Sequence, residues 1–192
     1  MTAQATPLFL LAIACLATTS SLATSSGDAY VVDACSVTRY RDLCVHSLAS
    51  FSSTARNSPS MWARAGVSVT IGEAKSVARH LAALRKGKGR YKSNISDCVE
   101  CFEDTLDNLH RSLGVLRKLS VSEFGSQVED VMTWLSAALT DEDTCLDGFE
   151  ERNTGKLVRG FINRVNNVTY MTSNALALVN KLATAGPACL VN

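Results

Sequence analysis

Apolar residues recur at intervals of three and four along four long segments of this chain, over 59–86, over 96–119, from 123 to 149 and from 157 to 186. The second segment shows the spacing well, with apolar residues at Cys98, Phe102, Leu106, Leu109, Leu113 and Leu116. Such spacing places the apolar side chains on one face of an α-helix. The pattern therefore predicts four amphipathic helices of about 24 to 30 residues.

Residues with strong positional preferences mark the ends of these helices. Ser58 suits the N-cap of the first long helix, and Pro59 suits its first helical position, where the missing N–H is not needed. Ser120 lies three residues before Glu123, the spacing of a capping box. Gly186-Pro187 is expected to end the last helix.

Short polar connections separate the four helices, so their apolar faces are expected to meet in one core. We predict an all-α fold, an antiparallel up-and-down four-helix bundle with a left-handed twist over 58–186. Two shorter apolar segments, 29–35 and 38–51, precede it and indicate a helical hairpin within 24–57. Helices of that length are marginal alone, so the hairpin needs a cross-link or a docking surface.

The first residues have the pattern of a signal peptide. An uncharged start is followed by an apolar run over 7–17 and then by small residues, and this run is too short to span a bilayer. We expect a signal peptide over 1–23, with cleavage after Ala23 or, as the nearby alternative, after Ser26. The protein would then be secreted, with a single domain over 24–192 and no membrane segment.

Six cysteines remain once Cys15 leaves with the signal peptide: Cys35, Cys44, Cys98, Cys101, Cys145 and Cys189. They are expected to pair in an oxidising compartment, but six cysteines allow fifteen connectivities. The C-x-x-C spacing at 98–101 does not indicate a redox or zinc site, because no strand–helix–strand pattern surrounds it and the histidines are scattered singly. We expect no metal and no cofactor. Two sequons, at Asn94 and Asn167, fit glycosylation on exposed faces.

Charge is balanced overall but uneven along the chain. The formal net charge of +1 argues against bulk binding of nucleic acid. Seven basic and no acidic residues lie within 75–92, whereas nine acidic and no basic residues lie within 123–151. There is no nucleophile elbow or glycine-rich phosphate loop, and Asp141 and Asp143 fall in what reads as ordinary surface charge. We therefore expect a binding protein and not an enzyme.

Four sequence segments, in this order and spacing, resemble a known family. They are CSVTRYRDLC at 35–44, DCVECFEDTLD at 97–107, TWLSAALT with TCLDGF at 133–149, and SNALAL at 173–178. Together they are similar to the plant invertase and pectin methylesterase inhibitors, and the similarity spans essentially the whole mature chain. Invertase inhibitors of that family typically carry a Pro-Lys-Phe segment, which is absent here. The chain resembles most closely a stand-alone pectin methylesterase inhibitor, with acid invertase as the alternative target.

The resemblance implies two disulfide bridges, Cys35–Cys44 and Cys98–Cys145. Cys101 and Cys189 lie outside the family's usual pattern, and three states are open for them: a bridge to each other, free thiols, or a link to another chain. The second bridge would join two neighbouring bundle helices and stabilise the fold by about 4 kcal/mol on the chain-entropy model.

The resemblance also implies a mechanism: secretion to the apoplast and cell wall, and a stoichiometric complex in which bundle helices cover the pectin-binding cleft of the esterase. Candidate contact residues come from the polar faces of the second and third long helices: Glu103, Asp107, His110, Glu129, Asp130, Thr133 and Thr144. Trp134 lies off the apolar stripe and fits either an exposed anchor or partial burial. A weak contact between the basic loop at 85–92 and acidic pectin is a further expectation.

Overall fold

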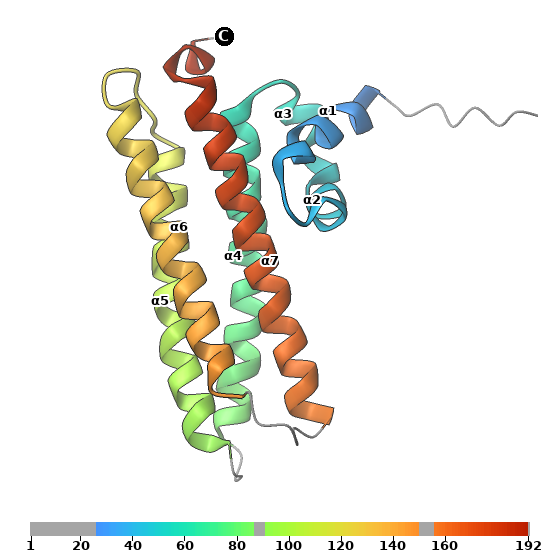
Figure 1. The fold of residues 1–192 in the computed structure, drawn as a ribbon, viewed down its shortest axis with the longest axis vertical. Helices are drawn as coiled ribbons and strands as arrows, with labels where there is room; N and C mark the ends of the chain where they lie inside the picture. The colour runs from blue at the N-terminus through green and yellow to red at the C-terminus, as the bar shows by residue number, and fades with distance from the viewer. Residues whose placement is uncertain (1–25, 87–90, 150–155, 192) are drawn as a thin grey trace, which may run out of the picture.

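Four long antiparallel helices form the body of the protein in a computed structural model that describes residues 26–86, 91–149 and 156–191. The bundle helices are α4 (Pro59–Arg85), α5 (Lys92–Leu116), α6 (Phe124–Asp147) and α7 (Lys156–Ala185) (Figure 1). Every regular element in these ranges is helical. The predicted signal peptide and residues 87–90 of the basic loop lie outside the described residues.

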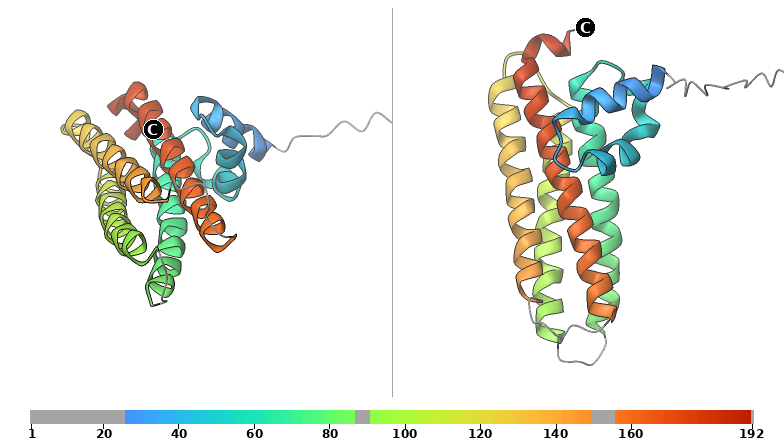
Figure 2. Two further views of the ribbon diagram at one scale, coloured as in Figure 1. Left: turned by 60° about the horizontal axis from the view of Figure 1, so that its bottom comes forward. Right: turned by 45° about the vertical axis from the view of Figure 1, so that its right-hand side comes forward.

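The helices run alternately up and down around one core. Each packs against two others, so that α4 contacts α5 and α7, and α6 contacts α5 and α7. Figures 1 and 2 show α5 beside α6 and α4 beside α7, with the C-terminus at the end of the bundle where α4 begins. The predicted all-α up-and-down bundle is confirmed.

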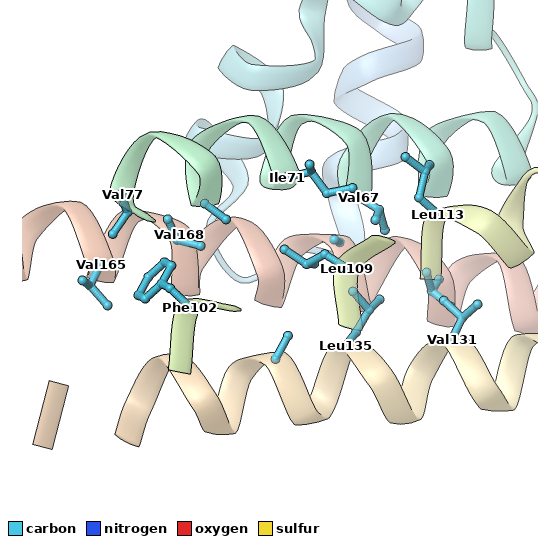
Figure 3. Packing of buried hydrophobic residues seen from close by; sticks show 14 of the residues in the cluster. Val67, Ile71, Val77, Phe102, Leu109, Leu113, Val131, Leu135, Val165 and Val168 are labelled. Atoms are coloured by element: carbon cyan, nitrogen blue, oxygen red, sulfur yellow. The ribbon is translucent and has the colours of Figure 1, made fainter. Parts of the chain in front are cut away.

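The core consists of the apolar stripes read from the sequence. Phe102 and Leu109 of α5 meet Leu135 of α6 and Val168 of α7, and all four are fully buried (Figure 3). Full burial of one such side chain is worth roughly 1.5–3 kcal/mol. The polar side chain of Thr172 on α7 is also buried.

The helix starts differ slightly from prediction. α4 begins as expected at Pro59, with the Ser58 hydroxyl accepting from the Met61 backbone N–H. α5 begins at Lys92 and not at residue 96, and it ends at Leu116 and not at residue 119. The termini of a helix carry the weakest periodic signal, because few of their side chains reach the core.

The predicted capping box before α6 is half correct. The Ser120 hydroxyl accepts from the Glu123 N–H at 3.3 Å, as expected. The reciprocal bond comes from another residue, since the Gln127 side-chain oxygen accepts from the Ser120 N–H at 2.9 Å. Gln127 thus takes the role that the sequence pattern gave to Glu123.

The N-terminal hairpin contains more pieces than the two helices predicted: α1 (Ser26–Ala34), η1 (Cys35–Val37), α2 (Arg41–Leu48), η2 (Ala49–Phe51) and α3 (Ser52–Ala55). The Cys35–Cys44 bridge joins its two arms, with the Cα atoms 5.8 Å apart. Cys35 and Cys44 are both buried, and the bridge lies in a small second core that is separate from the core of the bundle.

Polar contacts dock this hairpin on α7. The Asn174 side chain accepts from the Tyr40 N–H at 3.1 Å and donates to the Tyr40 carbonyl at 2.9 Å. The Tyr40 ring stacks on Tyr170 with the ring centroids 4.0 Å apart, and the Lys181 ammonium pairs with Asp33 at 2.9 Å. Because Asn174 imitates a backbone pairing partner, it fixes one register between the hairpin and the bundle.

The last helix ends where the sequence predicted. Gly186 follows α7 with a φ of 73°, a left-handed conformation that favours glycine, and Pro187 opens the short η3 (Pro187–Leu190). None of the helices in the described ranges is long and apolar enough to cross a membrane.

Candidate partner-binding face

A covalent bridge and a polar contact join α5 to α6. Cys98 and Cys145 form the second disulfide implied by the family resemblance, with their Cα atoms 4.6 Å apart. Higher on the same seam, the Asn108 amide donates to the Asp141 carboxylate at 3.2 Å. Side chains of a helix lean toward the N-terminus of that helix. Because α5 and α6 are antiparallel, the side chain of Asn108 leans along the bundle axis toward Asp141, and that of Asp141 leans toward Asn108. The two helices therefore form one stiff unit.

All seven residues nominated from the sequence for partner contact are exposed. On α6, Asp130, Thr133 and Thr144 follow a spacing of three and then eleven residues, which places them on one side of the helix. Glu129 lies one position further round. We use the term α5–α6 face for the exposed surface of these two helices.

The nominated residues of α5 follow a second line. Glu103, Asp107 and His110 are spaced at four and three, and Asp107 pairs with Arg111 at 2.7 Å. This line differs from that of Asn108, whose side chain contacts α6. The structure thus brings all seven residues onto two adjacent helices, but along two lines and not in one tight cluster.

Hydroxyl groups form a ladder along the exposed side of α6. Thr133, Ser136, Thr140 and Thr144 each donate to the carbonyl oxygen four residues earlier, at 2.7–3.1 Å. A hydroxyl that gives its proton to the backbone still has lone pairs to accept with. Together with the carboxylates of Glu129 and Asp130, the ladder makes this face rich in acceptors, which suits a partner that supplies N–H and cationic donors.

Sequence reasoning missed the residues at the seam itself. Asp141 is half-buried, and burial raises the pKa of its carboxyl; the hydrogen bond from Asn108 opposes this rise and the nearby Asp104 adds to it. Trp134 is half-buried, so partial burial and not full exposure is the outcome for this residue. The Cys98–Cys145 pairing carried the missing signal, because it fixes which residues of α5 and α6 face each other.

The acidic stretch at 141–143 is not ordinary surface charge, contrary to the sequence-based expectation. Glu142 is fully buried between α6 and α7. Its Oε1 lies 2.7 Å from the hydroxyl of Thr172, which also lies 3.1 Å from the carbonyl of Val168. A protonated Glu142 satisfies both distances at once, since it donates to the Thr172 oxygen while that hydroxyl donates its single proton to Val168.

Burial favours the protonated form of Glu142. It raises the pKa of Glu142 to about 8, although the hydroxyls of Thr172 and Thr169, which can donate to the charged form, pull the value down. Oε2 of Glu142 is left without a hydrogen-bond partner in the described part of the chain, as is the buried hydroxyl of Thr105 on α5. A neutral acid with a free carbonyl oxygen costs far less to bury than a carboxylate in the same position.

The two remaining cysteines do not pair with each other. Cys101 lies in the lower half of α5, and Cys189 lies in η3 beyond the upper end of α7 (Figure 1). The fifteen residues of α5 above Cys101 alone span about 22 Å at about 1.5 Å each, whereas a bridge needs Cα atoms within about 7 Å. Neither is bridged within the described residues of the chain, and burial is the main cause that raises the pKa of each thiol.

Neither sequon lies on a fully exposed face as expected. Asn94 is half-buried in the first turn of α5, and its amide donates to the carbonyl of Gly148 at the end of α6. Asn167 is half-buried in the middle of α7, with its amide nitrogen 3.8 Å from the sulfur of Met171. Glycosylation at these two positions remains a prediction.

Charge divides the bundle into two halves. The described side chains of α5 and α6 include eleven acidic residues against Lys92 and Arg111, whereas those of α4 and α7 include seven Lys and Arg residues against Glu73. The polarity seen along the sequence is therefore a polarity across the fold. Within the described ranges, no group of three or more His, Cys, Asp or Glu side chains is arranged to hold a metal ion.

These features define a class: a disulfide-linked four-helix bundle with an appended helical hairpin, which presents a stiff, acceptor-rich face. The chain belongs to the plant invertase/pectin methylesterase inhibitor family, whose sequence model matches residues 29–178.

Several relatives of this chain are named pectinesterase inhibitors. The chain is 50% identical over 160 residues to pectinesterase inhibitor 6 of Arabidopsis thaliana, covering 82% of this chain and 77% of that protein. It is 37% identical over 187 residues to pectinesterase inhibitor 9 of the same plant, covering 92% of each. In fold it is similar to a crystal structure of a mutant pectin methylesterase inhibitor from Arabidopsis, with a TM-score of 0.63 at 20% identity over 81% of this chain and 97% of that one.

Proposed function

We propose that this protein is a secreted inhibitor of pectin methylesterase that binds the enzyme stoichiometrically across its pectin-binding cleft. The observation that carries the proposal is the 50% identity to a protein named pectinesterase inhibitor, over most of both chains. Its site of action would be the apoplast and cell wall, where the signal-peptide pattern would send it.

The α5–α6 face is the part of the molecule best suited to the contact. Its backbone is held by the Cys98–Cys145 bridge and by the Asn108–Asp141 hydrogen bond. Because so little conformational freedom remains to be lost on docking, more of the contact energy appears as affinity. The inhibitor needs no chemistry of its own in this mechanism, since it only has to exclude the polymer.

The acidic character of this face predicts how binding responds to solution conditions. Exposed carboxylates attract a basic partner surface over a distance that shrinks as salt is added, with a screening length of about 10 Å at 0.1 M. Affinity is expected to fall with salt. It is also expected to fall as acidification removes the charge of the face, beginning with Asp141, whose carboxyl pKa is raised.

A titration of enzyme activity tests the proposal. The concentration of a pectin methylesterase is held well above the dissociation constant of the complex, and inhibitor is added in steps. The residual activity of the esterase should fall linearly and reach its minimum at one inhibitor per enzyme. The same titration with an acid invertase tests the alternative target on the same scaffold. Inhibition of the invertase with no effect on the esterase would overturn the proposal in favour of that alternative, and inhibition of neither would overturn both.

A further inference from the structure

The α4–α7 side of the bundle, toward the end where α4 finishes and α7 begins, carries exposed positive charge that the proposed inhibition does not use. Six exposed residues supply it: Lys75, Arg79, Arg85, Lys86, Arg159 and Arg164. We call this surface the basic end. Figure 2 shows α4 and α7 as a pair distinct from α5 and α6.

The charges of the basic end are not neutralised within the described parts of the chain. The two ion pairs found there involve Arg111 with Asp107 on α5, and Lys181 with Asp33 near the opposite end of α7. The acidic residue of α4, Glu73, is half-buried and precedes this cluster in the helix. The six cations therefore present their charge to solvent.

The cations are also spread along a stiff rod. Lys75, Arg79 and Lys86 follow one another at intervals of four and seven, which places them on one side of α4. They span about 16 Å along the helix axis at about 1.5 Å per residue. A row of charge of this kind matches an extended polymer with regularly repeated negative groups better than a single small anion.

We propose that the basic end binds de-esterified pectin, a polymer of uronic acid with one carboxylate on each unesterified sugar. This inference rests on the proposed function, because the esterase supplies the ligand: water adds to each methyl ester, methanol leaves and a carboxylate and a proton remain. The substrate of the esterase is nearly neutral, and its product is a polyanion. The inhibitor is thus held on the wall polymer where the esterase has already worked, while the acidic α5–α6 face stays turned to the enzyme.

The test uses the inhibitor alone, so that it does not depend on inhibition. Retention of the full-length secreted protein on immobilised polygalacturonate is measured against salt and compared with retention on fully methyl-esterified pectin. The protein should bind the acidic polymer, with affinity that falls as salt rises, and should not bind the esterified one.

Matched variants locate the surface. Lys75→Gln with Arg79→Gln should weaken binding to polygalacturonate by about tenfold at low salt. The control, Arg117→Gln with Lys118→Gln, removes two exposed cations beyond the upper end of α5 and should leave binding unchanged. Equal weakening by both pairs would show that net charge alone is responsible and would overturn the assignment.

Two further results separate this inference from the function on which it rests. The Lys75→Gln with Arg79→Gln variant should inhibit the esterase like the wild type on highly esterified pectin, because the basic end lies outside the proposed enzyme contact. Absence of binding to polygalacturonate, with inhibition intact, would overturn this inference alone. Binding to vesicles of anionic phospholipid but not to polygalacturonate would overturn it in favour of a membrane surface.

Discussion

The two halves of the bundle share one core and differ in almost everything outside it. The α5–α6 half is acidic, is joined by the Cys98–Cys145 bridge and contains the buried acid Glu142. The α4–α7 half is basic, has no bridge in its described residues and carries the hairpin, which Asn174 holds in place. The comparison teaches that the apolar stripes determine the fold, whereas the cross-links and charges decide which side is stiff and what each side attracts.

Removal of the Cys98–Cys145 bridge should have the largest effect on stability. Cys98 and Cys145 are 47 positions apart, and a loop of that size predicts that replacing both by serine lowers the free energy of unfolding by about 4 kcal/mol. The Cys35–Cys44 bridge spans 9 positions, and its removal should cost less, about 3 kcal/mol. Chemical denaturation of the two double variants compares them, and a larger loss for Cys35–Cys44 would contradict the view that α5–α6 is the stiffened half.

Glu142 should make the bundle more stable in acid than at neutral pH. Its folded pKa of about 8 exceeds the reference value of 4.5, so the folded state holds a proton that the unfolded state loses between these values. This contribution to the free energy of unfolding is fully present below about pH 4 and is lost as pH rises toward 8. At pH 7 about 3 kcal/mol of it has been lost. Other carboxyls titrate in the same range, so the effect must be read as a difference between two proteins.

Glu142→Gln is that second protein. The amide has nearly the same shape, can donate to Thr172 and carries no charge at any pH. Its free energy of unfolding should match that of the wild type near pH 4 and exceed it at pH 7 to 8. Parallel pH profiles for the two proteins would mean that Glu142 is not held protonated in the core.

The hairpin of the α4–α7 half depends on a smaller set of contacts. Asn174→Ala removes both hydrogen bonds to the backbone of Tyr40 and should cost about 2 kcal/mol, because it leaves a part-buried N–H and carbonyl unpaired. Hydrogen exchange should then rise in α1 and α2 and stay unchanged in α5 and α6. A loss of protection throughout the bundle would show that the hairpin is part of the main core and not an appendage.

The fold could be predicted from the sequence because the pattern of apolar residues that produces it is periodic. The stripe from Cys98 to Leu116 repeats over several turns, and so many residues agree that a single error does not matter. The ends of helices depend on one or two residues, which is why α5 began at Lys92 and why Gln127 replaced Glu123 in the cap. The two bridges came from family resemblance, since spacing alone left fifteen pairings open.

The candidate site was only partly predictable for a related reason. Exposure of Thr133 and Thr144 follows from their place opposite the apolar stripe, so the sequence could find them. Burial of Glu142 could be read from the spacing, because Glu142 lies four residues after Ala138 and three before Cys145 and so falls on the apolar stripe of α6. Half-burial of Asp141 depends on how α6 meets α5, which is a property of a pair of helices.

The central claim is that the α5–α6 face binds the esterase, and one matched pair of variants tests it most directly. Thr133 on α6 and Thr184 on α7 are both exposed, and each donates its hydroxyl to the carbonyl four residues earlier, so replacing either by arginine costs the fold about the same. The measurement is the inhibition constant of each variant against a pectin methylesterase. Thr133→Arg should raise it about 30-fold, or about 2 kcal/mol, and Thr184→Arg should leave it unchanged. Weakening by Thr184→Arg with none by Thr133→Arg would place the contact on the opposite half and contradict the account.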